Sequence, residues 1–368
     1  MQHILFLEKW HSHNGGIQKV NTNLASAMRS QSIMTTFYVY KTSGPHREGF
    51  DKLKSTFNAV TPPQETGFLN KLMHLYSTIK SQNVTCIVAA TETANILAAL
   101  CVLRYPKLNV IYTRHCAFDV DGQKLSPKKI KLLYNLYALT NKRIGAVSES
   151  LAQEIRSHLL INKSCVHFLP NAVVNAEIDC LADKEQDNPY IGTSYFCAVG
   201  RLTEQKGFDL LLESYAIALS KSKEGTLPNL VIVGDGELKP ELTKLAKSLN
   251  IQDKVIFHGF TPNPYAIIKG AQAFLLSSRH EGMPTVIIES MFIGTPVVSF
   301  DCPTGPRELI EDGVNGILVE NGNVAAFANV LTTESWRTLH CEKSFVNQFE
   351  NNHAASLYLN HLSGAAHG

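Results

Sequence analysis

Short apolar runs alternate along the chain with longer segments whose apolar residues recur at helical spacing. The runs lack apolar–polar alternation, which is typical of parallel strands buried on both faces. In the first half they lie at 3–8, 35–40, 84–90, 109–114, 143–148 and 165–169. In the second half they lie at 195–199, 229–233, 254–258, 273–277, 296–300 and 316–319. Helical segments, including 18–29, 69–81 and 148–158, lie between most of the runs, which predicts an α/β fold with parallel sheets.

The chain of 368 residues is longer than one ordinary domain, so this pattern predicts two domains. We expect doubly wound, Rossmann-like domains at 1–175 and 193–340, joined by an acidic linker at 176–192. A C-terminal helical segment, 341–368, could cross back to the first domain. Two such domains would face a central cleft, and ligands of doubly wound sheets bind beyond the carboxyl ends of the strands. Residues that follow strands are therefore the candidates for chemistry.

Composition and charge narrow the classes of partner. Apolar residues make up 44% of the chain and the net charge is only +2, which is typical of a globular protein and argues against nucleic acid as a partner. The charge is unevenly distributed, with a net +9 over residues 1–180 and −7 over the remainder. This asymmetry suggests that the two halves do different jobs.

The cysteines and the apolar runs indicate the compartment. The eight cysteines are never closer than fifteen residues, so none has zinc or redox-motif spacing, and we expect reduced, buried thiols. The N-terminus has no signal-peptide pattern, and the longest apolar stretch, 94–103, has half of the roughly 20 residues that a membrane span needs. We expect a cytoplasmic protein with peripheral membrane contact at most.

The most informative segment is 277–296, where a strand ends at Ser277 and a buried helix follows. Pro284 suits the first turn of that helix and Gly294 its C-terminal cap. Glu289 is the anomaly on this apolar helix, because a buried carboxylate needs hydrogen-bond donors. Those donors are either a structural partner, such as an arginine or a backbone cap, or the vicinal hydroxyls of a ligand such as ribose.

Three further segments follow strands and could hold an anion. Glu281 precedes the same helix, where the amides of Gly282, Met283 and Thr285 could bind a phosphate. Arg201 and Lys206 follow the strand at 195–199 and could pair with phosphate oxygens, although a solvated surface is an equal alternative. The sequence at 234–236, Gly-Asp-Gly, is half of a dinucleotide fingerprint, and no complete GxGxxG occurs in the chain.

In the first half, Gly15 and Gly16 follow the first strand and would let a ligand approach the backbone, unless they form an ordinary turn. His115 follows the strand at 109–114, between Arg114 and Asp119, and has either a structural or a functional role. No GxSxG and no zinc-spaced His/Cys set is present, and no separated DxD-type pair of carboxylates stands out as a metal site. We therefore expect metal-independent chemistry with no cofactor.

Together these residues resemble the family-4 retaining glycosyltransferases of the GT-B fold. The resemblance rests on their order along the chain and extends from about residue 3 to 360. The motifs that carry it are Gly15-Gly16, His115, Pro170-Asn171, Gly200-Arg201…Lys206-Gly207, Gly234-Asp-Gly236, His258-Gly-Phe260, Asn263-Pro-Tyr265, Glu281-x7-Glu289 and Asp312-Gly-Val-Asn-Gly316. Two departures are Gln272, where the family often has Asp, and Gln18, where Glu is frequent; the second puts acceptor contacts near Gln18 in doubt.

The resemblance implies a role for each matched residue. Arg201 and Lys206 would neutralise the diphosphate of the donor in place of a metal ion, and Glu289 would bind its ribose. Glu281, with Gly282, Met283, Pro284 and Thr285, would hold the transferred sugar. His115 would contact that sugar from the first domain, and Gly15 and Gly16 would lie against the diphosphate or the acceptor. The domain at 1–175 would thus bind the acceptor, and the domain at 193–340 would bind the nucleotide sugar.

The resemblance also implies the reaction. We expect transfer, with retention, of a hexose or N-acetylhexosamine from a nucleotide-diphosphate sugar, with UDP favoured over GDP-mannose. The segment 301–308 is similar to segments of bacterial surface-polysaccharide transferases, so the acceptor would be a glycan of lipopolysaccharide, capsule or lipid-linked oligosaccharide synthesis. The alternatives are a nucleotide-sugar epimerase, for which no flanking acid–base carboxylates are found, a sugar dehydrogenase, which needs the missing fingerprint, and a non-catalytic sugar-binding protein.

Basic residues cluster around the apolar segment 130–137 of the first half. They are Lys124, Lys128, Lys129, Lys131, Lys142 and Arg143. Lysines beside leucines and tyrosines suit a helix that rests on anionic lipid. The alternative is a domain helix with an ordinary charged face.

Overall fold

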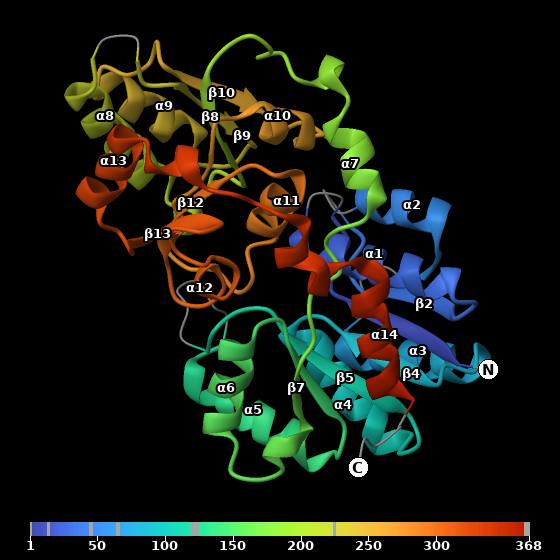
Figure 1. Cartoon of the computed structure of the whole chain (residues 1–368). Helices are drawn as coiled ribbons and strands as arrows, with labels where there is room; N and C mark the ends of the chain where they lie inside the picture. The colour runs from blue at the N-terminus through green and yellow to red at the C-terminus, as the bar shows by residue number, and fades with distance from the viewer. Residues whose placement is uncertain are drawn as a thin grey trace. The chain divides into compact units, whose positions relative to one another are not determined.

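The computed structural model describes residues 2–12, 15–43, 47–63, 67–118, 125–223 and 226–363. The chain divides into two compact units (Figure 1). The first comprises Met1–Val173 with Phe349–Gly368, and the second comprises Val174–Gln348. The C-terminal end of the chain thus belongs to the first unit.

The first unit is built on a seven-stranded parallel sheet of order β3-β2-β1-β4-β5-β6-β7. Every strand pairing in it is parallel, and all six residues of β1 are buried, which explains why the strands read as unbroken apolar runs. The strands are β1 (His3–Glu8), β2 (Met34–Val39), β3 (Asn58–Val60), β4 (Cys86–Ala89), β5 (Asn109–Arg114), β6 (Arg143–Ala146) and β7 (Val166–Phe168).

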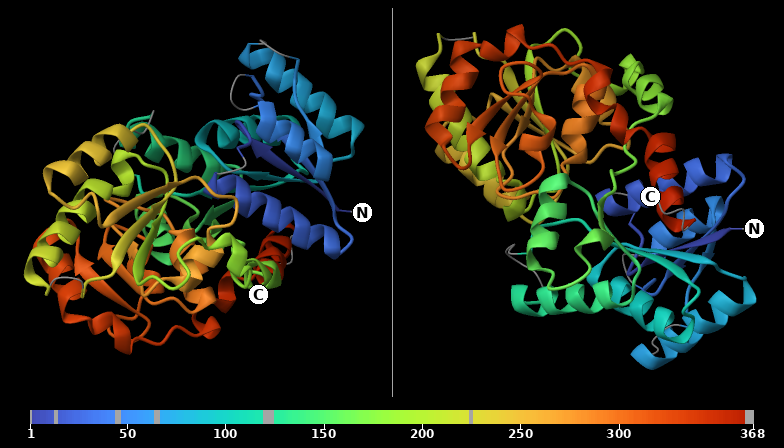
Figure 2. Two further views of the ribbon diagram at one scale, coloured as in Figure 1. Left: turned by 90° about the horizontal axis from the view of Figure 1, so that it is seen from above. Right: turned by 60° about the horizontal axis from the view of Figure 1, so that its bottom comes forward.

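Helices pack against this sheet (Figure 2). They are α1 (Gly16–Ser30), α2 (Arg47–Thr56), α3 (Phe68–Ser81), α4 (Glu92–Arg104), α5 (Pro127–Leu139), α6 (Glu149–His158), the short η2 (Lys163–Cys165) and the C-terminal α14 (Asn351–Leu362). Thr91 and Ser148 cap α4 and α6 with their side-chain oxygens. Ala354, Ala355 and Tyr358 of α14 are buried in the same core as Leu24 and Met28 of α1, which ties the C-terminal segment to the first unit.

The second unit holds a six-stranded parallel sheet of order β10-β9-β8-β11-β12-β13. Its strands are β8 (Tyr195–Val199), β9 (Asn229–Val233), β10 (Val255–Gly259), β11 (Phe274–Leu276), β12 (Val297–Asp301) and β13 (Gly316–Glu320). Its helices are α7 (Ala176–Ala182), η3 (Glu185–Asp187), η4 (Glu204–Lys206), α8 (Phe208–Lys221), α9 (Lys239–Ser248), α10 (Tyr265–Gly270), α11 (Thr285–Ile293), α12 (Pro306–Leu309), α13 (Val324–Thr333), η5 (Ser335–Thr338) and η6 (Lys343–Phe349), the last reaching into the first unit.

The strand order reverses once in each sheet. In the first sheet the chain fills positions on one side of β1 and then returns to place β4 on the other side. In the second sheet β8 and β11 are the corresponding neighbours, with Cys197 opposite Phe274. Loops that leave the carboxyl ends of two such strands diverge, and doubly wound sheets bind their ligands there.

The two parallel sheets confirm the predicted α/β fold class, and every predicted strand is present. The sequence did not reveal β3, whose three residues Asn58–Val60 are only partly buried at the edge of the first sheet. The segment predicted as a linker, 176–192, instead contains α7 and η3 and lies inside the second unit. Asn175 explains this difference, because its side chain accepts from the amides of Glu177 and Ile178 and so begins α7.

Candidate functional site

At the point of reversal in the second sheet, the loop after β8 lies against the loop after β11. The amide of Arg279 donates to the carbonyl of Gln205 at 2.8 Å, and Ser277 Oγ donates to the carbonyl of Lys206 at 2.9 Å. Two segments that the sequence marked separately as anion sites, 200–207 and 277–285, are therefore adjacent. The structure places Arg201, Lys206, Glu281 and the start of α11 at one edge of one sheet.

Glycines allow this close approach of the loops. Gly207 has φ +60°, and a Cβ there would lie 2.1 Å from the carbonyl oxygen of Ser277. A Cβ at Gly234 would lie 1.9 Å from the carbonyl oxygen of Gly200, and one at Gly236 would lie 2.5 Å from that of Leu202. The half fingerprint at 234–236 thus packs the loop after β9 against the loop after β8.

Lys206 and Glu281 form an ion pair inside this cluster. Lys206 Nζ lies 2.6 Å from Glu281 Oε1, and Ser278 Oγ donates to the same oxygen at 2.6 Å. The side chain of Glu281 is only 8% exposed, so these donors compensate its burial. Glu281 Oε2 has no hydrogen-bond partner among the described residues, and the ammonium of Lys206 has two further N–H groups to offer. The pair therefore has both an acceptor and donors left for a ligand.

The two arginines of these loops differ in their partners. Arg279 donates to both carboxylate oxygens of Asp209, at 2.8 and 2.6 Å. Burial acts to raise the pKa of Asp209, but the hydrogen bonds and charge of Arg279 outweigh it and hold that pKa below its ordinary value. Arg201, by contrast, is exposed, and its side chain makes no ion pair with any residue in the described ranges. Arg279 is satisfied within the protein, whereas Arg201 can bind a ligand.

The segment that leads into α11 presents unpaired backbone donors. The amides of Gly282, Met283 and Thr285 donate to no other residue among those that the structure describes. Helix α11 begins at Thr285, directly after Pro284, and ends at Gly294 with φ +92°, as the sequence predicts. Behind this segment, a Cβ at Gly305 would lie 2.5 Å from Pro284 Cδ, and Thr304 Oγ1 donates to the carbonyl of Glu281. The loop after β12 thus supports the free amides.

Glu289 is 4% exposed and accepts a hydrogen bond from Tyr265 Oη at 3.2 Å. Tyr265 begins α10, and its own amide donates to Asn263 Oδ1 at 3.2 Å. A structural donor to Glu289 is thus a tyrosine, and not the arginine or backbone cap expected from the sequence. The motif Asn263-Pro-Tyr265 was the sequence signal for this contact. The Asn263 side chain accepts from the Tyr265 amide and so holds Tyr265 at the start of α10.

His115 of the first unit follows β5, as predicted, and the structure favours one ring tautomer. Thr113 Oγ1 donates to the carbonyl of Ala89 at 2.7 Å, so it accepts from His115 Nε2–H at 3.0 Å. This leaves a lone pair on Nδ1. Burial, together with the charge of Arg114, lowers the pKa of His115 to about 4, so the ring is neutral near pH 7. The predicted neighbour Asp119 lies outside the described residues.

Gly15 and Gly16 lie at the start of α1, also in the first unit. A Cβ at Gly16 would meet no atom within 4 Å, which leaves its backbone accessible, while one at Gly15 would meet the flexible side chain of Gln18. Gln18 donates to the carbonyl of Trp10 at 3.3 Å and so holds the loop after β1. The glycine pair and His115 are on the first unit, and the remaining predicted site residues are on the second.

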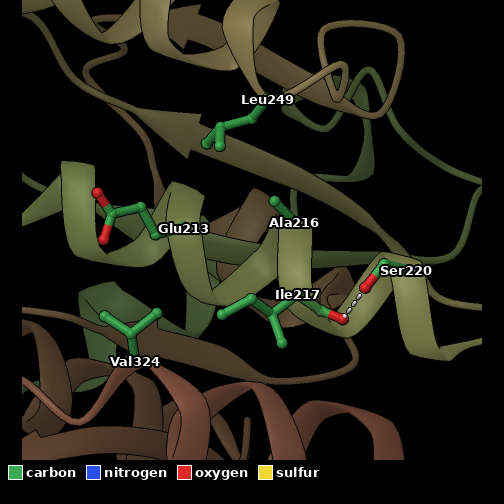
Figure 3. Close-up of a pocket in the computed structure, with 6 residues that line it drawn as sticks. All are labelled: Glu213, Ala216, Ile217, Ser220, Leu249 and Val324. Atoms are coloured by element: carbon green, nitrogen blue, oxygen red, sulfur yellow. Dashed lines mark hydrogen bonds between the residues drawn. The ribbon is translucent and has the colours of Figure 1, made fainter.

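A pocket of about 450 Å³ lies elsewhere on the second unit (Figure 3). Its lining residues are Glu213, Ala216, Ile217, Ser220, Leu249 and Val324. None of the predicted site residues contributes to it. It offers no cation and no unpaired amide for an anionic ligand, so we place the candidate site at the β8/β11 loops and not in this pocket.

Family models match both units of the chain. The model for "Glycosyltransferase Family 4" matches residues 14–176, and the model for "Glycosyl transferases group 1" matches residues 182–333. Between residues 14 and 333, only 177–181 are left unmatched. This chain is a glycosyltransferase. The epimerase, dehydrogenase and non-catalytic alternatives are thereby set aside.

Curated relatives agree with this family. The glycosyltransferase is 25% identical to an uncharacterized glycosyltransferase of Haemophilus influenzae over 84% of each chain. It is 22% identical to the lipopolysaccharide 1,6-galactosyltransferase of Escherichia coli over 92% of this chain and 90% of that one. The match to the glycosyltransferase MJ1059 of Methanocaldococcus jannaschii, at 32% identity, covers 55% of this chain and half of that protein's length.

Solved structures confirm the GT-B fold of the glycosyltransferase. The lipopolysaccharide outer core galactosyltransferase WaaB aligns with a TM-score of 0.73 at 18% identity, over 99% of this chain and 100% of that one. Anabaena HepE in complex with UDP-glucose aligns with a TM-score of 0.78 at 18% identity over the same shares. In the described part of the glycosyltransferase, no helix combines the length and apolar character that crossing a bilayer requires.

Proposed function

We propose that this glycosyltransferase moves a hexose or N-acetylhexosamine, with retention and without a metal ion, from a UDP-sugar to a glycan acceptor. One observation carries the proposal. Three unpaired amides, at Gly282, Met283 and Thr285, lie in the loop after β11, which packs against the loop after β8 that holds Arg201 and Lys206. Amides at a helix N-terminus bind anions, and two cations beside them suit a diphosphate. Glu289, further along α11, would accept the ribose hydroxyls.

The proposed chemistry places negative charge where these donors lie. As the bond between the sugar C1 and the diphosphate oxygen breaks, charge grows on the leaving phosphate, and Arg201, Lys206 and the free amides stabilise it. The acceptor oxygen bonds to C1 on the same face, and its proton passes to the leaving phosphate oxygen. No side chain has to act as a nucleophile. Glu281 Oε2 would hold hydroxyls of the transferred sugar, and the lone pair on His115 Nδ1 would accept a hydrogen bond from that sugar.

Relatives support the choice of substrates. Anabaena HepE was solved with UDP-glucose, and the pneumococcal O-GlcNAc transferase GtfA with UDP and GlcNAc. A Campylobacter jejuni relative, 33% identical over 47% of this chain and 45% of that one, is an N-acetylgalactosaminyltransferase acting on a diphospho-undecaprenol-linked sugar. We therefore favour a UDP-sugar donor and an acceptor in lipopolysaccharide or lipid-linked oligosaccharide synthesis, in the cytoplasm.

The proposed function predicts stabilisation by a nucleotide sugar and transfer in the absence of metal. We expect one of UDP-glucose, UDP-galactose, UDP-N-acetylglucosamine and UDP-N-acetylgalactosamine to raise the melting temperature most. At a concentration of 100 times its Kd, that ligand should add about 2.7 kcal/mol to the free energy of unfolding. GDP-mannose is the control. Transfer to octyl glycosides of glucose, galactose and N-acetylglucosamine, followed by NMR of the product, would then give the anomeric configuration. An inverted product, or loss of activity in EDTA that Mg²⁺ restores, would contradict the proposal.

We also propose that the first unit rests on an anionic membrane, through a surface that differs from the one predicted. Tyr134 and Tyr137 are buried in the first unit and cannot face lipid. Leu132, Leu136 and Leu139 are instead the exposed apolar residues of α5, at 62%, 48% and 60%. Their spacing of four and three residues places them on one face of the helix.

Two further apolar residues adjoin that face. Leu160 is 86% and Ile161 45% exposed, and their loop is held to α5 because Asn135 Oδ1 accepts from the Leu160 amide at 2.8 Å. Asn162 adds a hydrogen bond to the carbonyl of Ala138 at 3.0 Å. Lys128, Lys129 and Lys163 are exposed nearby, and residues 125–148 contain no Asp or Glu, whereas Lys124 lies outside the described residues. Apolar side chains flanked by lysines complement anionic lipid.

We expect the protein to sediment with phosphatidylglycerol vesicles and to be released as salt rises, because each lysine near the surface contributes about 1 kcal/mol at low ionic strength. The substitution Leu160→Glu should weaken this binding about tenfold or more. Leu103→Glu is the matched control, because Leu103 is 75% exposed at the end of α4. Equal effects of the two substitutions, or binding that is indifferent to lipid charge, would remove the membrane surface from the proposal.

A further inference from the structure

The last residue of β1, Glu8, forms a buried polar cluster that the chemistry above does not use. Glu8 is 1% exposed, and its two carboxylate oxygens have separate partners. Oε2 lies 2.7 Å from His11 Nδ1, and Oε1 accepts from Asn21 Nδ2 at 2.7 Å. His11 and Asn21 are themselves 5% and 2% exposed. A carboxylate this deeply buried requires such donors, so the three residues form one unit.

The cluster lies where the first sheet reverses its strand order. Glu8 ends β1, which has β2 on one side and β4 on the other, and His11 lies in the loop beyond this carboxyl end. Asn21 comes from α1, the helix that begins at Gly16. Within the first unit, this edge is where a doubly wound sheet binds its ligand.

Packing from two other elements fixes the imidazole and its loop. The ring of Phe37 on β2 meets the ring of His11 edge-on at 6.0 Å. A Cβ at Gly49 of α2 would lie 2.4 Å from the carbonyl oxygen of His11, so the backbone there is also held closely. The imidazole is therefore oriented by β1, β2, α1 and α2 together. Such preorganisation is what a binding group requires.

The hydrogen bond to Glu8 decides what the other ring nitrogen can do. Glu8 accepts from Nδ1–H, so in the neutral ring Nε2 carries a lone pair and acts as an acceptor. Nε2 donates to and accepts from none of the residues that the structure describes. A hydroxyl, the most abundant donor on a glycan, can bind to such a lone pair. The carboxylate on Nδ1 strengthens Nε2 as an acceptor, as it does for histidines in other sites.

We propose that His11, positioned by Glu8 and Asn21, is a specificity-determining residue that accepts a hydrogen bond from a hydroxyl of the acceptor glycan. This rests on the proposed function and on the predicted role of the first domain in binding the acceptor. The attacking hydroxyl gives its proton to the leaving phosphate, so His11 binds a neighbouring hydroxyl and takes no proton. His11 thus selects which sugar can accept.

Two substitutions of similar size distinguish binding from a purely structural role. In His11→Asn the amide reaches only the position of Nδ1 and can keep the contact with Glu8. In His11→Gln the amide reaches the position of Nε2. We expect His11→Asn to raise the acceptor KM about tenfold, the effect of one lost hydrogen bond, and His11→Gln to raise it no more than about threefold. The donor KM should stay within about twofold in both.

The assay uses the octyl glycosides of glucose, galactose and N-acetylglucosamine, together with their monodeoxy derivatives. One monodeoxy derivative should be about tenfold poorer with the wild-type enzyme and no poorer than its parent with His11→Asn. Melting temperatures of both variants control for folding. Equal acceptor KM values for the two variants, or a smaller change for His11→Asn, would show that the cluster is structural and overturn the inference.

A measurement without any substitution guards against variants that do not fold. In ¹⁵N-histidine NMR of the wild-type protein, the Nε2 resonance of His11 should shift when an octyl glycoside is added at millimolar concentration and not when UDP is added. No shift with any glycoside would overturn the inference. If the wild-type protein transfers no sugar from any UDP-sugar, the proposed function itself has failed. If the wild-type protein transfers sugar and both His11 variants have the acceptor KM of the wild type, only the role of His11 is refuted.

Discussion

Replacing Arg201 with alanine is expected to lower kcat by about 10²-fold or more, the loss that follows removal of one preorganised group from a developing negative charge. Arg201 is exposed and has no ion-pair partner in the described ranges, so its removal should leave the melting temperature within about a degree of the wild type. The measurement is single-turnover transfer with saturating UDP-sugar. It separates the chemical step from product release, which steady-state kcat can conceal.

Lys206→Ala should lower kcat by a similar factor, but it also breaks the ion pair with Glu281 and so costs stability. The double variant Lys206→Ala with Glu281→Gln separates the two effects. It leaves no uncompensated carboxylate at position 281, so stability is restored, while the cation of Lys206 is still absent. The surface variant Lys247→Ala, in the last turn of α9, is the control for loss of a positive charge from the same unit. Near-normal single-turnover rates in folded Arg201→Ala and Lys206→Ala proteins would refute the proposed role of both cations.

The fold could be predicted from the sequence because the strands are buried on both faces. A run such as that of β8 (Tyr195–Val199) can be assigned without tertiary knowledge, because it is apolar throughout, too short for a helix and followed directly by Gly200. The predicted linker shows the limit of that signal. Helix α7 has only seven residues, too few to show a helical period, and its start is capped by the side chain of Asn175, a local contact that hydrophobic periodicity does not report.

The residues of the candidate site could be selected from the sequence, but the hydrogen bonds and ion pairs between them could not. Position after a strand is enough to select Arg201, Lys206 and Glu281, since every carboxyl end in a parallel sheet meets the same edge. The ion pair between Lys206 and Glu281 depends on β8 and β11 being neighbours. This follows from strand order and cannot be inferred from two residues that are 75 positions apart in the sequence. For the same reason, Tyr265 could not be paired with Glu289.

The cluster of Glu8, His11 and Asn21 was missed for a different reason. Glu8 is the last residue of the strand predicted at 3–8 and was assigned no role, yet it is among the most buried charged residues in the described part of the chain. Spacing gave the signal that was available: a His three residues after a strand-end Glu, and an Asn on the inward face of the following helix. Lys128 and Lys129 are exposed, whereas Tyr134 and Tyr137 on the same helix are buried, because exposure depends on helix phase, which composition alone does not give.

Glu289→Gln is expected to raise the KM for the UDP-sugar about tenfold to a hundredfold while the acceptor KM stays unchanged. A buried carboxylate can accept from both hydroxyls of a ribose, and hydrogen bonds to a charged group contribute about 1.5–3 kcal/mol each. The amide keeps the volume and the contact from Tyr265 Oη, so the core around α11 is retained. Circular dichroism and the melting temperature check that assumption.

Donors with a deoxygenated ribose make the test of Glu289 specific. The wild-type enzyme should bind 2′-deoxy- and 3′-deoxy-UDP-sugars about tenfold less well than the parent donor. In Glu289→Gln that discrimination should shrink, because the carboxylate that recognises the missing hydroxyl has gone. If Glu289→Gln weakened all three donors by the same factor, Glu289 would be supporting the start of α11 through Tyr265 and not contacting the ribose. The burial of Glu289 on an apolar helix would then have a structural explanation. Residues other than Glu289 would have to orient the nucleoside of the donor.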